Sequence, residues 1–406
     1  MSVSSDHKLS RRRFVIAGGA LLGVVTAGAS GVGYLLHRVN RIGDREGLLS
    51  PSRITDPQSA LFRAYPGLRD HIPFRSLATL PTPVEKLDII NGTATGRLWV
   101  KRDDLTSPHY GGNKIRKLEH LLEHALQQGC NSLITIGGLG SNHCLATAIH
   151  GARLGIKVHL SLFDQPVTSF VRQNLAGYLA AGAEIHYCAT LKKAYGFSRG
   201  LLKQLKKKKE NPYFILSGGT CGLSNVGHVN AAFEIREQIE RGDLPEPDRL
   251  FVAAGTCGTM SGLIAGLKLA DLSTRVVGVR VVDGFPAYPR VIRYYAQSVA
   301  DQLRKFEPSM AKVHIGMSDF ELMTGYLGDG YGVVTAEAVE AVRQASPAIT
   351  LETTYTGKTL AACIDYCRKG SSAENILFWN SFNSSPFEQS TTPGALPESI
   401  IRKLES

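Results

Sequence analysis

The chain of 406 residues is long enough to bury a large hydrophobic core, and two domains are the default expectation at this length. Its hydrophobic fraction of 43% and charged fraction of 20% are those of an ordinary globular protein. The formal net charge of +11 suits anionic small molecules. The one dense basic run, 206–209, has no interleaved aromatic residues, which favours a solvated helix end over a nucleic-acid site. Seven cysteines without a Cys-x-x-Cys pair argue against a zinc ribbon and a disulfide framework, and we predict no metal site.

The first 39 residues have the order of an export signal or a membrane anchor. Residues 10–15, Ser-Arg-Arg-Arg-Phe-Val, resemble a twin-arginine signal and lead into an apolar run at 15–36. Small residues at 27–29 offer a cleavage site, whereas the run is also long enough to span a bilayer. We expect a periplasmic protein, or one anchored to the inner membrane through 14–36 and facing the periplasm. A cytoplasmic protein with an unusual N-terminus is the remaining alternative.

After a linker and lead-in at 40–75, short β-rich runs alternate with amphipathic helical patterns. In chain order we predict strand Leu98–Val100, helix Lys114–Gln127, strand Ser132–Ile136, helix Asn142–Leu154, strand Val158–Phe163, helix Phe170–Ala181, strand Glu184–Tyr187, a basic helical stretch, strand Tyr213–Leu216, helix Val229–Gln238, strand Leu250–Ala254, helix Met260–Leu269, strand Arg275–Val282, helices Thr335–Gln344 and Gly357–Cys367, and strand Ile376–Trp379. Strands separated by helices predict an α/β fold with a parallel sheet covered on both faces. The catalytic region is expected at 76–402, with a smaller subdomain around 130–215.

Lys114 lies where a Gly-rich loop, Gly111-Gly112-Asn113, becomes a helix. Asn113 is suited to cap the helix, and the helix dipole disfavours a positive charge in the first turn. A lysine there has a lowered pKa, which an amine that forms a Schiff base needs. Taken alone, the same string is also typical of a plain surface helix start.

A second strand-to-helix junction combines glycines with hydroxyl groups. Its residues are Gly255, Thr256, Cys257, Gly258 and Thr259. The glycines permit close approach of the backbone, and the free N–H groups at the helix start favour a phosphate. The loop lacks the Gly-Lys-Ser/Thr ending of a nucleotide P-loop and the Gly-x-Gly-x-x-Gly of a dinucleotide site. A purely structural turn is the alternative.

Two more loops of this kind follow predicted strands. Ser141, Asn142 and His143 place a hydroxyl, an amide and an imidazole at a helix N-terminus after 137–140, where an anion is favoured. The plain alternative is a Ser/Asn cap with His143 on the helix surface. Residues 217–220, Ser-Gly-Gly-Thr, form a third such loop or a simple turn. Loops at the ends of parallel strands meet at one edge of the sheet, so a lysine, a phosphate loop and anion-binding loops together suit pyridoxal phosphate and an amino-acid carboxylate.

Several ordered motifs resemble the aminocyclopropane-carboxylate deaminase / D-cysteine desulfhydrase family. The similarity runs from about residue 80 to residue 379. The matching segments are Pro81–Leu87, Lys101–Leu105, Gly111–Glu119, Gly138 with Ser141–His143, and Tyr355–Lys358. The resemblance implies the tryptophan-synthase-β-like fold, called fold type II, with two open parallel-sheet domains and pyridoxal 5'-phosphate between them. It also implies a homodimer that acts on a small amino acid.

The resemblance assigns roles to residues of this chain. Lys114 would bind the cofactor covalently and later move protons, and Gly255–Thr259 would bind its phosphate. Asn142 would hydrogen-bond the ring hydroxyl, and Ser141, beside the substrate carboxylate with His143, would act as base or nucleophile. Tyr355 would flank the cofactor ring, and Tyr331 matches a second active-site tyrosine.

Two positions bear on the substrate. In the family, a glutamate after the ring-flanking tyrosine accompanies the deaminase and a threonine is typical of the desulfhydrase; this chain has Thr356. The family's His-x-Gly-Gly is replaced by Asn380–Asn383, in which Ser381 keeps a hydroxyl for the substrate and Phe382 is expected to intrude. We therefore predict a lyase that eliminates the β-substituent of D-cysteine or a similar amino acid, yielding pyruvate, ammonia and sulfide. Aminocyclopropane-carboxylate deaminase and an exported, non-catalytic binding protein are the alternatives.

Overall fold

The computed structural model describes residues 59–89, 97–285, 287–369, 374–390 and 396–405. The predicted signal or anchor, including the membrane contact at 14–36, lies outside these residues. Among the residues described, no helix is both long and apolar enough to cross a membrane. The chain divides into two compact units. The first holds 121–223 and the described residues after 387, and the second holds 59–120 and 224–387 within the described ranges.

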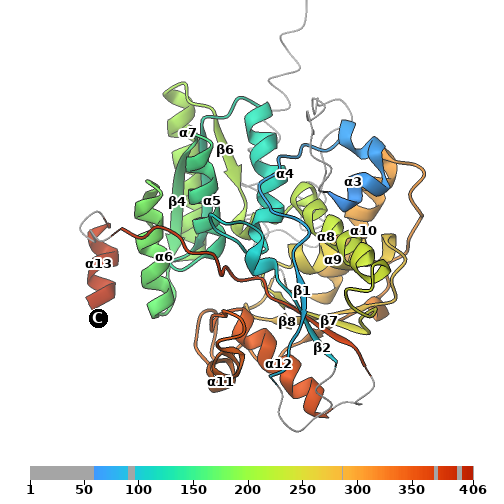
Figure 1. Cartoon of the computed structure of the whole chain (residues 1–406). Coiled ribbons are helices and arrows are strands. Elements are labelled where there is room, and N and C mark those ends of the chain that lie inside the picture. The colour runs from blue at the N-terminus through green and yellow to red at the C-terminus, as the bar shows by residue number, and fades with distance from the viewer. Residues whose placement is uncertain (1–58, 90–96, 286, 370–373, 391–395, 406) are drawn as a thin grey trace, which may run out of the picture. The chain divides into compact units, whose positions relative to one another are not determined.

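The first unit is built on a four-stranded parallel sheet in the order β5-β4-β3-β6 (green in Figure 1). Its strands are β3 (Ser132–Gly138), β4 (Lys157–Phe163), β5 (Glu184–Tyr187) and β6 (Pro212–Ile215). Its helices are α5 (Asn142–Arg153), α6 (Ser169–Ala180), α7 (Leu191–Lys207) and α13 (Glu398–Glu405), and it takes the C-terminal part of α4 (Lys114–Gln127).

Alternate residues of β3 face different helices, as the two-residue period of a strand requires. Ile134 and Ile136 pack in one hydrophobic cluster with Leu201 and Leu205 of α7. Leu133 faces α5, and a methyl group at Gly151 of α5 would lie only 3.2 Å from its side chain. Both faces of this sheet are therefore covered, as its uninterrupted run of buried residues predicts.

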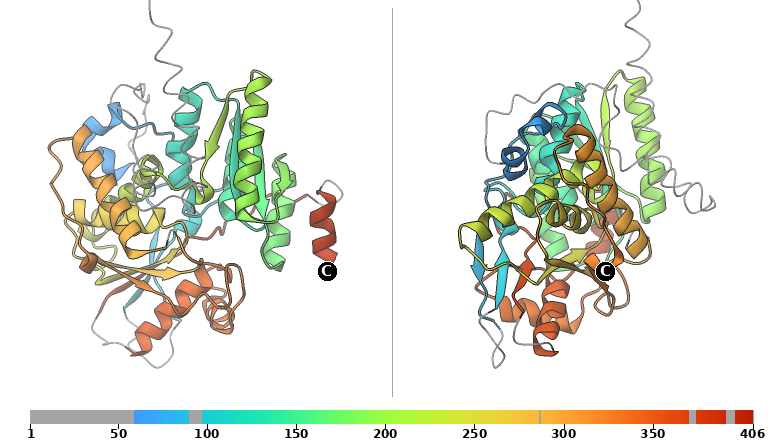
Figure 2. Two further views of the ribbon diagram at one scale, coloured as in Figure 1. Left: turned by 180° about the vertical axis from the view of Figure 1, so that it is seen from behind. Right: turned by 90° about the vertical axis from the view of Figure 1, so that its right-hand side faces the viewer.

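The second unit is built on a six-stranded sheet in the order β1-β2-β10-β7-β8-β9. The strands are β1 (Val84–Lys86), β2 (Leu98–Lys101), β7 (Arg249–Ala254), β8 (Arg275–Arg280), β9 (Phe320–Met323) and β10 (Ile376–Trp379). Helices α11 (Ala336–Ala345) and α12 (Thr356–Lys369) cover one face, and α8 (Gly222–Glu240), α9 (Gly258–Leu269) and α10 (Pro289–Phe306) lie on the other, as the two views of this unit in Figures 1 and 2 show. The short helix α3 (Ala60–Ala64) and the 3-10 turns η2 (Pro66–Asp70), η3 (Asp103–Leu105), η4 (Ser217–Gly219) and η5 (Met317–Asp319) complete the described secondary structure.

The α/β prediction is confirmed, and the predicted elements occur with ends shifted by a few residues. The predicted parallel pairing is confirmed for both sheets except at the edge strand β1, which pairs antiparallel with β2. Helix α10 was also missed, although its buried residues recur at helical spacing and Pro289 stands in its first turn, where proline is favoured.

Candidate active site

Lys114 is the first residue of α4, which follows the loop after β2. Its side chain is half-buried, and desolvation by the surrounding protein lowers its pKa from 10.5 to about 8. The prediction of a lowered pKa is confirmed, although burial is the cause. An amine with this pKa is unprotonated in a useful fraction of molecules near neutral pH, as a Schiff-base lysine requires.

The two glycines before Lys114 are required by close backbone packing. A methyl group at Gly111 would lie 2.2 Å from the carbonyl oxygen of Asp104, and Gly112 has a φ of +94° that L side chains rarely adopt. Gly111 N–H donates to Oδ1 of Asn383 at 2.5 Å, and Asn113 N–H donates to the carbonyl of Ser381 at 3.2 Å. The loop that carries the lysine is therefore held against the segment that follows β10.

A buried network of charges fixes α4 two residues after Lys114. Arg116 donates to Oδ1 of Asp103 at 2.7 Å and to Oε2 of Glu234 at 3.0 Å, and Lys101 donates to Oε1 of Glu234 at 2.5 Å. Burial opposes the charge on Glu234, yet Arg116 and Lys101 together lower its pKa to about 2. The indole of Trp379 donates to Oδ2 of Asp103 at 3.0 Å, so the same network reaches β10.

The loop Gly255–Thr259 lies between β7 and α9 and has the backbone of an anion-binding site. Cys257 adopts a left-handed conformation, φ 61° and ψ 3°, which is uncommon for a residue other than glycine. This conformation before the first turn of α9 lets successive N–H groups point into one concavity. The thiol of Cys257 donates to the carbonyl of Gly255 at 3.3 Å, and burial raises its pKa to about 12, so it carries no charge that would repel an anion.

Asn113 links the lysine to this loop. Its Nδ2 donates to Oγ1 of Thr259, in the first turn of α9, at 2.8 Å. The start of α4, which carries Lys114, therefore meets the start of α9, where the loop Gly255–Thr259 ends. The sequence predicted Asn113 only as a cap, and this role of its amide was missed.

Two tyrosines stand next to the loop. The hydroxyl oxygens of Tyr331 and Tyr355 lie 2.5 Å apart, and their rings meet edge to face with centroids 6.1 Å apart. A methyl group at Gly255 would lie 3.9 Å from Cε1 of Tyr355 and no nearer than 3.8 Å to any other atom. Both tyrosines are half-buried, and the ring of Tyr355 lies next to Gly255 of the loop.

Thr356 is buried on the carboxylate of Glu352, a residue that the sequence reasoning missed. Its Oγ1 accepts from the N–H of Glu352 at 3.0 Å and lies 3.2 Å from Oε1 of the same residue. The Glu352 carboxylate also accepts the N–H groups of Thr354, Tyr355 and Thr356 at 2.6 to 2.9 Å, while burial raises its pKa. The Thr356 hydroxyl thus belongs to the start of α12, directly after Tyr355.

In the first unit, Ser141 and Asn142 stand at the start of α5. Ser141 is the N-cap, and its Oγ accepts from the N–H of Cys144 at 3.3 Å. Oδ1 of Asn142 accepts from Asn174 at 3.1 Å. His143 is buried with its Nε2 3.0 Å from Oγ1 of Thr135, so the alternative that placed it on the helix surface is wrong. The roles of these three residues toward cofactor and substrate stay predictions.

The segment Asn380–Asn383 packs on the lysine loop. Besides the bonds to Gly111 and Asn113, the amide of Asn380 donates to the carbonyl of Thr350 at 3.2 Å and accepts from the N–H of Phe382 at 3.3 Å. Asn383 thus supports the backbone at a position where the family has glycine. The hydroxyl of Ser381 as a substrate contact and the intrusion of Phe382 stay predictions.

Within the second unit, the structure brings Lys114, the loop Gly255–Thr259, Tyr355 and Tyr331 into one neighbourhood. The chain carries what pyridoxal phosphate needs: a low-pKa lysine, a loop of N–H and hydroxyl donors at a helix start near the positive charges of Lys117 and Arg280, and a tyrosine ring next to that loop. A signal for the missed charge network was present in the sequence, because four charged residues stand in a row at Lys101–Asp104, where the strand β2 ends.

The chain belongs to the pyridoxal-phosphate-dependent enzyme family, whose model matches residues 75–381. It is 33% identical over 312 residues to the mitochondrial bifunctional D-cysteine desulfhydrase/1-aminocyclopropane-1-carboxylate deaminase of Arabidopsis thaliana, covering 72% of this chain and 73% of that one. It is 30% identical over 304 residues to D-cysteine desulfhydrase of Salmonella paratyphi B, covering 72% and 88%. The solved structure of an ACC deaminase homologue matches with a TM-score of 0.69 and 29% identity over 82% of this chain and 96% of that one. The protein is an enzyme, and its cofactor is pyridoxal phosphate.

Proposed function

We propose that this enzyme is a lyase that converts D-cysteine, or a similar β-substituted amino acid, and water to pyruvate, ammonia and the leaving group, sulfide for cysteine. The relative from Salmonella carries the name of this activity. The single observation that carries the choice within the family is Thr356, whose hydroxyl is neutral and already engaged by Glu352. In the family, the side chain at this position would lie near the pyridine nitrogen of the cofactor. A neutral threonine there does not favour a protonated nitrogen, and an unprotonated nitrogen makes the cofactor a weaker electron sink. Such a sink is sufficient for expulsion of thiolate, a good leaving group.

Bound pyridoxal phosphate supplies an electron sink for the charge left when the α-proton is removed. Lys114 would hold the cofactor, and its free Nζ would take the α-proton of the substrate, because a pKa of about 8 permits both uptake and release of a proton near neutral pH. The hydroxyl pair of Tyr331 and Tyr355 holds a proton that can be given to the leaving sulfur. Ser141 and His143 receive the substrate carboxylate, and Asn142 receives the ring hydroxyl.

We infer the assembly and location in the same way. The chain would have the tryptophan-synthase-β-like fold, called fold type II, and the protein would form a homodimer. The family match begins at residue 75, so the basic and apolar segment at 10–36 precedes the conserved enzyme body and supports export to the periplasm or anchoring to the inner membrane.

One experiment tests the activity. Purified enzyme is expected to show the visible absorbance band of lysine-bound cofactor, which Lys114→Ala abolishes. Lys268→Ala, a change at a half-buried lysine that pairs with Asp319, should leave the band intact. D-cysteine should then yield pyruvate and sulfide in equal amounts, with L-cysteine as the stereochemical control. A band that survives Lys114→Ala would overturn the assignment of the lysine.

A second candidate is hydrolytic opening of 1-aminocyclopropane-1-carboxylate to α-ketobutyrate and ammonia. It is supported by the name of the Arabidopsis relative, which joins both activities in one protein. Formation of α-ketobutyrate without sulfide release from D-cysteine would select it over the desulfhydrase.

A further inference from the structure

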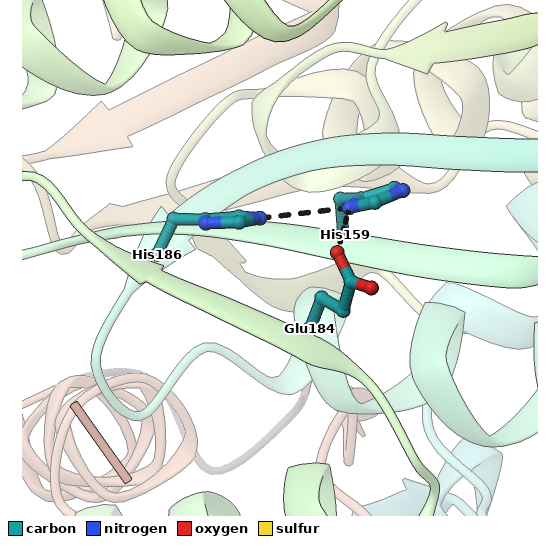
Figure 3. Close-up of side chains that lie close together, drawn as sticks. All are labelled: His159, Glu184 and His186. Atoms are coloured by element: carbon teal, nitrogen blue, oxygen red, sulfur yellow. Dashed lines mark hydrogen bonds and ion pairs between the residues drawn. The ribbon is translucent and has the colours of Figure 1, made fainter. Parts of the chain in front are cut away.

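Three potential metal ligands converge on one face of the sheet in the first unit, outside the site described above. His159 lies on β4, and Glu184 and His186 lie on the neighbouring edge strand β5 (Figure 3). The strand register pairs His159 with Glu184 and places His186 two residues further along on the same face. One ligand atom from each residue lies within 4.8 Å of the other two.

The distances fit one small cation. Nδ1 of His159 lies 2.9 Å from Oε2 of Glu184 and 3.5 Å from Nε2 of His186. Ligand atoms on a tetrahedral zinc ion, at about 2.0–2.1 Å from the metal, stand about 3.3 Å from one another. The two observed distances fall on either side of that value, so an ion needs only a small adjustment of the three side chains.

Hydrogen bonds alone cannot satisfy all three side chains of this cluster at once. Nδ1 of His159 carries either a proton or a lone pair, and it faces a carboxylate oxygen and an imidazole nitrogen together. A proton that is donated to Glu184 leaves His186 without a full hydrogen bond. A cation would accept a lone pair from all three atoms at once.

The surroundings hold the imidazoles ready for a metal. The side chain of His159 is only 2% exposed, so its ring has little freedom to leave the cluster. The ring of His186 packs against Phe197 of α7 at a centroid distance of 4.7 Å and stacks on His159 at 5.8 Å. Glu184 is 45% exposed, which leaves an entry path and room for water as a further ligand.

A lysine competes for the carboxylate. Nζ of Lys157 forms an ion pair with Oε1 of Glu184, the oxygen that does not face His159. Glu210 also acts on His159 and Lys157 through its charge, which favours a cation at this corner of the sheet. Lys157 therefore opposes binding of a cation and Glu210 supports it, and single substitutions can separate the two effects.

We propose that His159, Glu184 and His186 form a binding site for a divalent transition metal ion of the zinc type, which fastens the edge strand β5 to β4. His159 lies in the first half of β4, and Glu184 begins β5 with His186 two residues further along the strand. Ligands of parallel sheets instead bind beyond the carboxyl ends of the strands, where Ser141 follows β3. The site is therefore structural and separate from the pyridoxal-phosphate reaction.

The test uses the holoenzyme, freed of metal with a chelator and titrated with Zn²⁺ against a colorimetric indicator. We expect one zinc per chain and a rise in melting temperature. Glu184→Gln and His186→Ala should each weaken this binding at least tenfold and abolish the rise, because each removes one of three protein ligands. His314→Ala, which removes an exposed histidine of the second unit, is the matched control.

Lys157→Met gives a readout that a merely structural role of the three ligand residues would not produce. It removes the competing cation from Glu184 and should tighten zinc binding severalfold. Absence of zinc binding by the wild type overturns the proposal, as does binding that Glu184→Gln and His186→Ala leave unchanged. Circular dichroism confirms that each variant is folded, and should one of the two ligand variants unfold, the affinity of Lys157→Met decides: no tightening overturns the site.

Discussion

The side-chain amide of Asn113 donates to the hydroxyl of Thr259 at 2.8 Å, so the residue before Lys114 is bonded to the first turn of α9. Under the proposed function, Lys114 and the loop Gly255–Thr259 bind opposite ends of one rigid cofactor. A direct bond between their supports fixes this spacing before the cofactor arrives, which lowers the cost of ordering the site on binding.

The first prediction concerns this bond. Asn113→Ala and Thr259→Val should each raise the dissociation constant for pyridoxal phosphate about fivefold, which corresponds to about 1 kcal/mol for one net hydrogen bond. The double variant should bind no worse than the weaker single variant, because both changes remove the same bond. Thr274→Val, which removes a buried hydroxyl without a hydrogen-bond partner, should leave binding unchanged in the same absorbance titration.

The second prediction concerns the pH dependence of cofactor attachment. The amine of Lys114 reacts only when unprotonated, and burial lowers its pKa from 10.5 to about 8. At pH 7 roughly one molecule in ten therefore carries the reactive form, against fewer than one in a thousand for an ordinary lysine. The rate at which apoenzyme regains its absorbance band should rise with pH and level off above about 8. A rate that keeps rising toward pH 10 would contradict the lowered pKa.

The third prediction concerns specificity at Thr356. The single change Thr356→Glu should not create deaminase activity, because its carboxylate would be buried against that of Glu352. It should instead lower the melting temperature, since an unpaired buried charge costs several kcal/mol. Adding Glu352→Gln should restore much of the stability, and only this double variant should gain α-ketobutyrate formation at the expense of sulfide. Thr356→Ser keeps the hydroxyl and serves as the control.

The fourth prediction concerns acid stability. The pKa of Glu234 is about 2 in the folded chain against an ordinary 4.5, so its contribution is complete above about pH 4.5 and is lost as the pH falls toward 2. Glu234→Gln should reduce the free energy of unfolding at pH 7 by about 3 kcal/mol and flatten the loss of stability between pH 4.5 and 2. Glu237 lies on the same helix α8 and forms a partly exposed ion pair with Arg63. Glu237→Gln should therefore change the free energy of unfolding by less than about 1 kcal/mol. Denaturant unfolding over this pH range measures both.

Much of the site could be predicted from local sequence. The positions of Lys114 and of the loop Gly255–Thr259 at strand-to-helix junctions follow from glycines, caps and hydrophobic periodicity within a dozen residues. The role of Asn113 could not be predicted, because a short amide beside a helix start is as typical of a cap as of a bond to another helix. His143 illustrates the same limit: its local pattern allowed the helix surface, and burial against Thr135 of β3 decided otherwise.

The sequence by itself determined the alternation of strands and helices and, through ordered motifs, the enzyme family, and it predicted Lys114 as the cofactor lysine. Only the tertiary structure decided the sheet order, in which β2 and β7 both pair with β10 although more than a hundred residues separate each from it. It also decided that His159 lies opposite Glu184, and that Thr356 is engaged by Glu352. The physical reason is that periodicity and capping act over one or two turns of chain. Pairing between distant segments depends on which surfaces are buried together, and no local pattern records that choice.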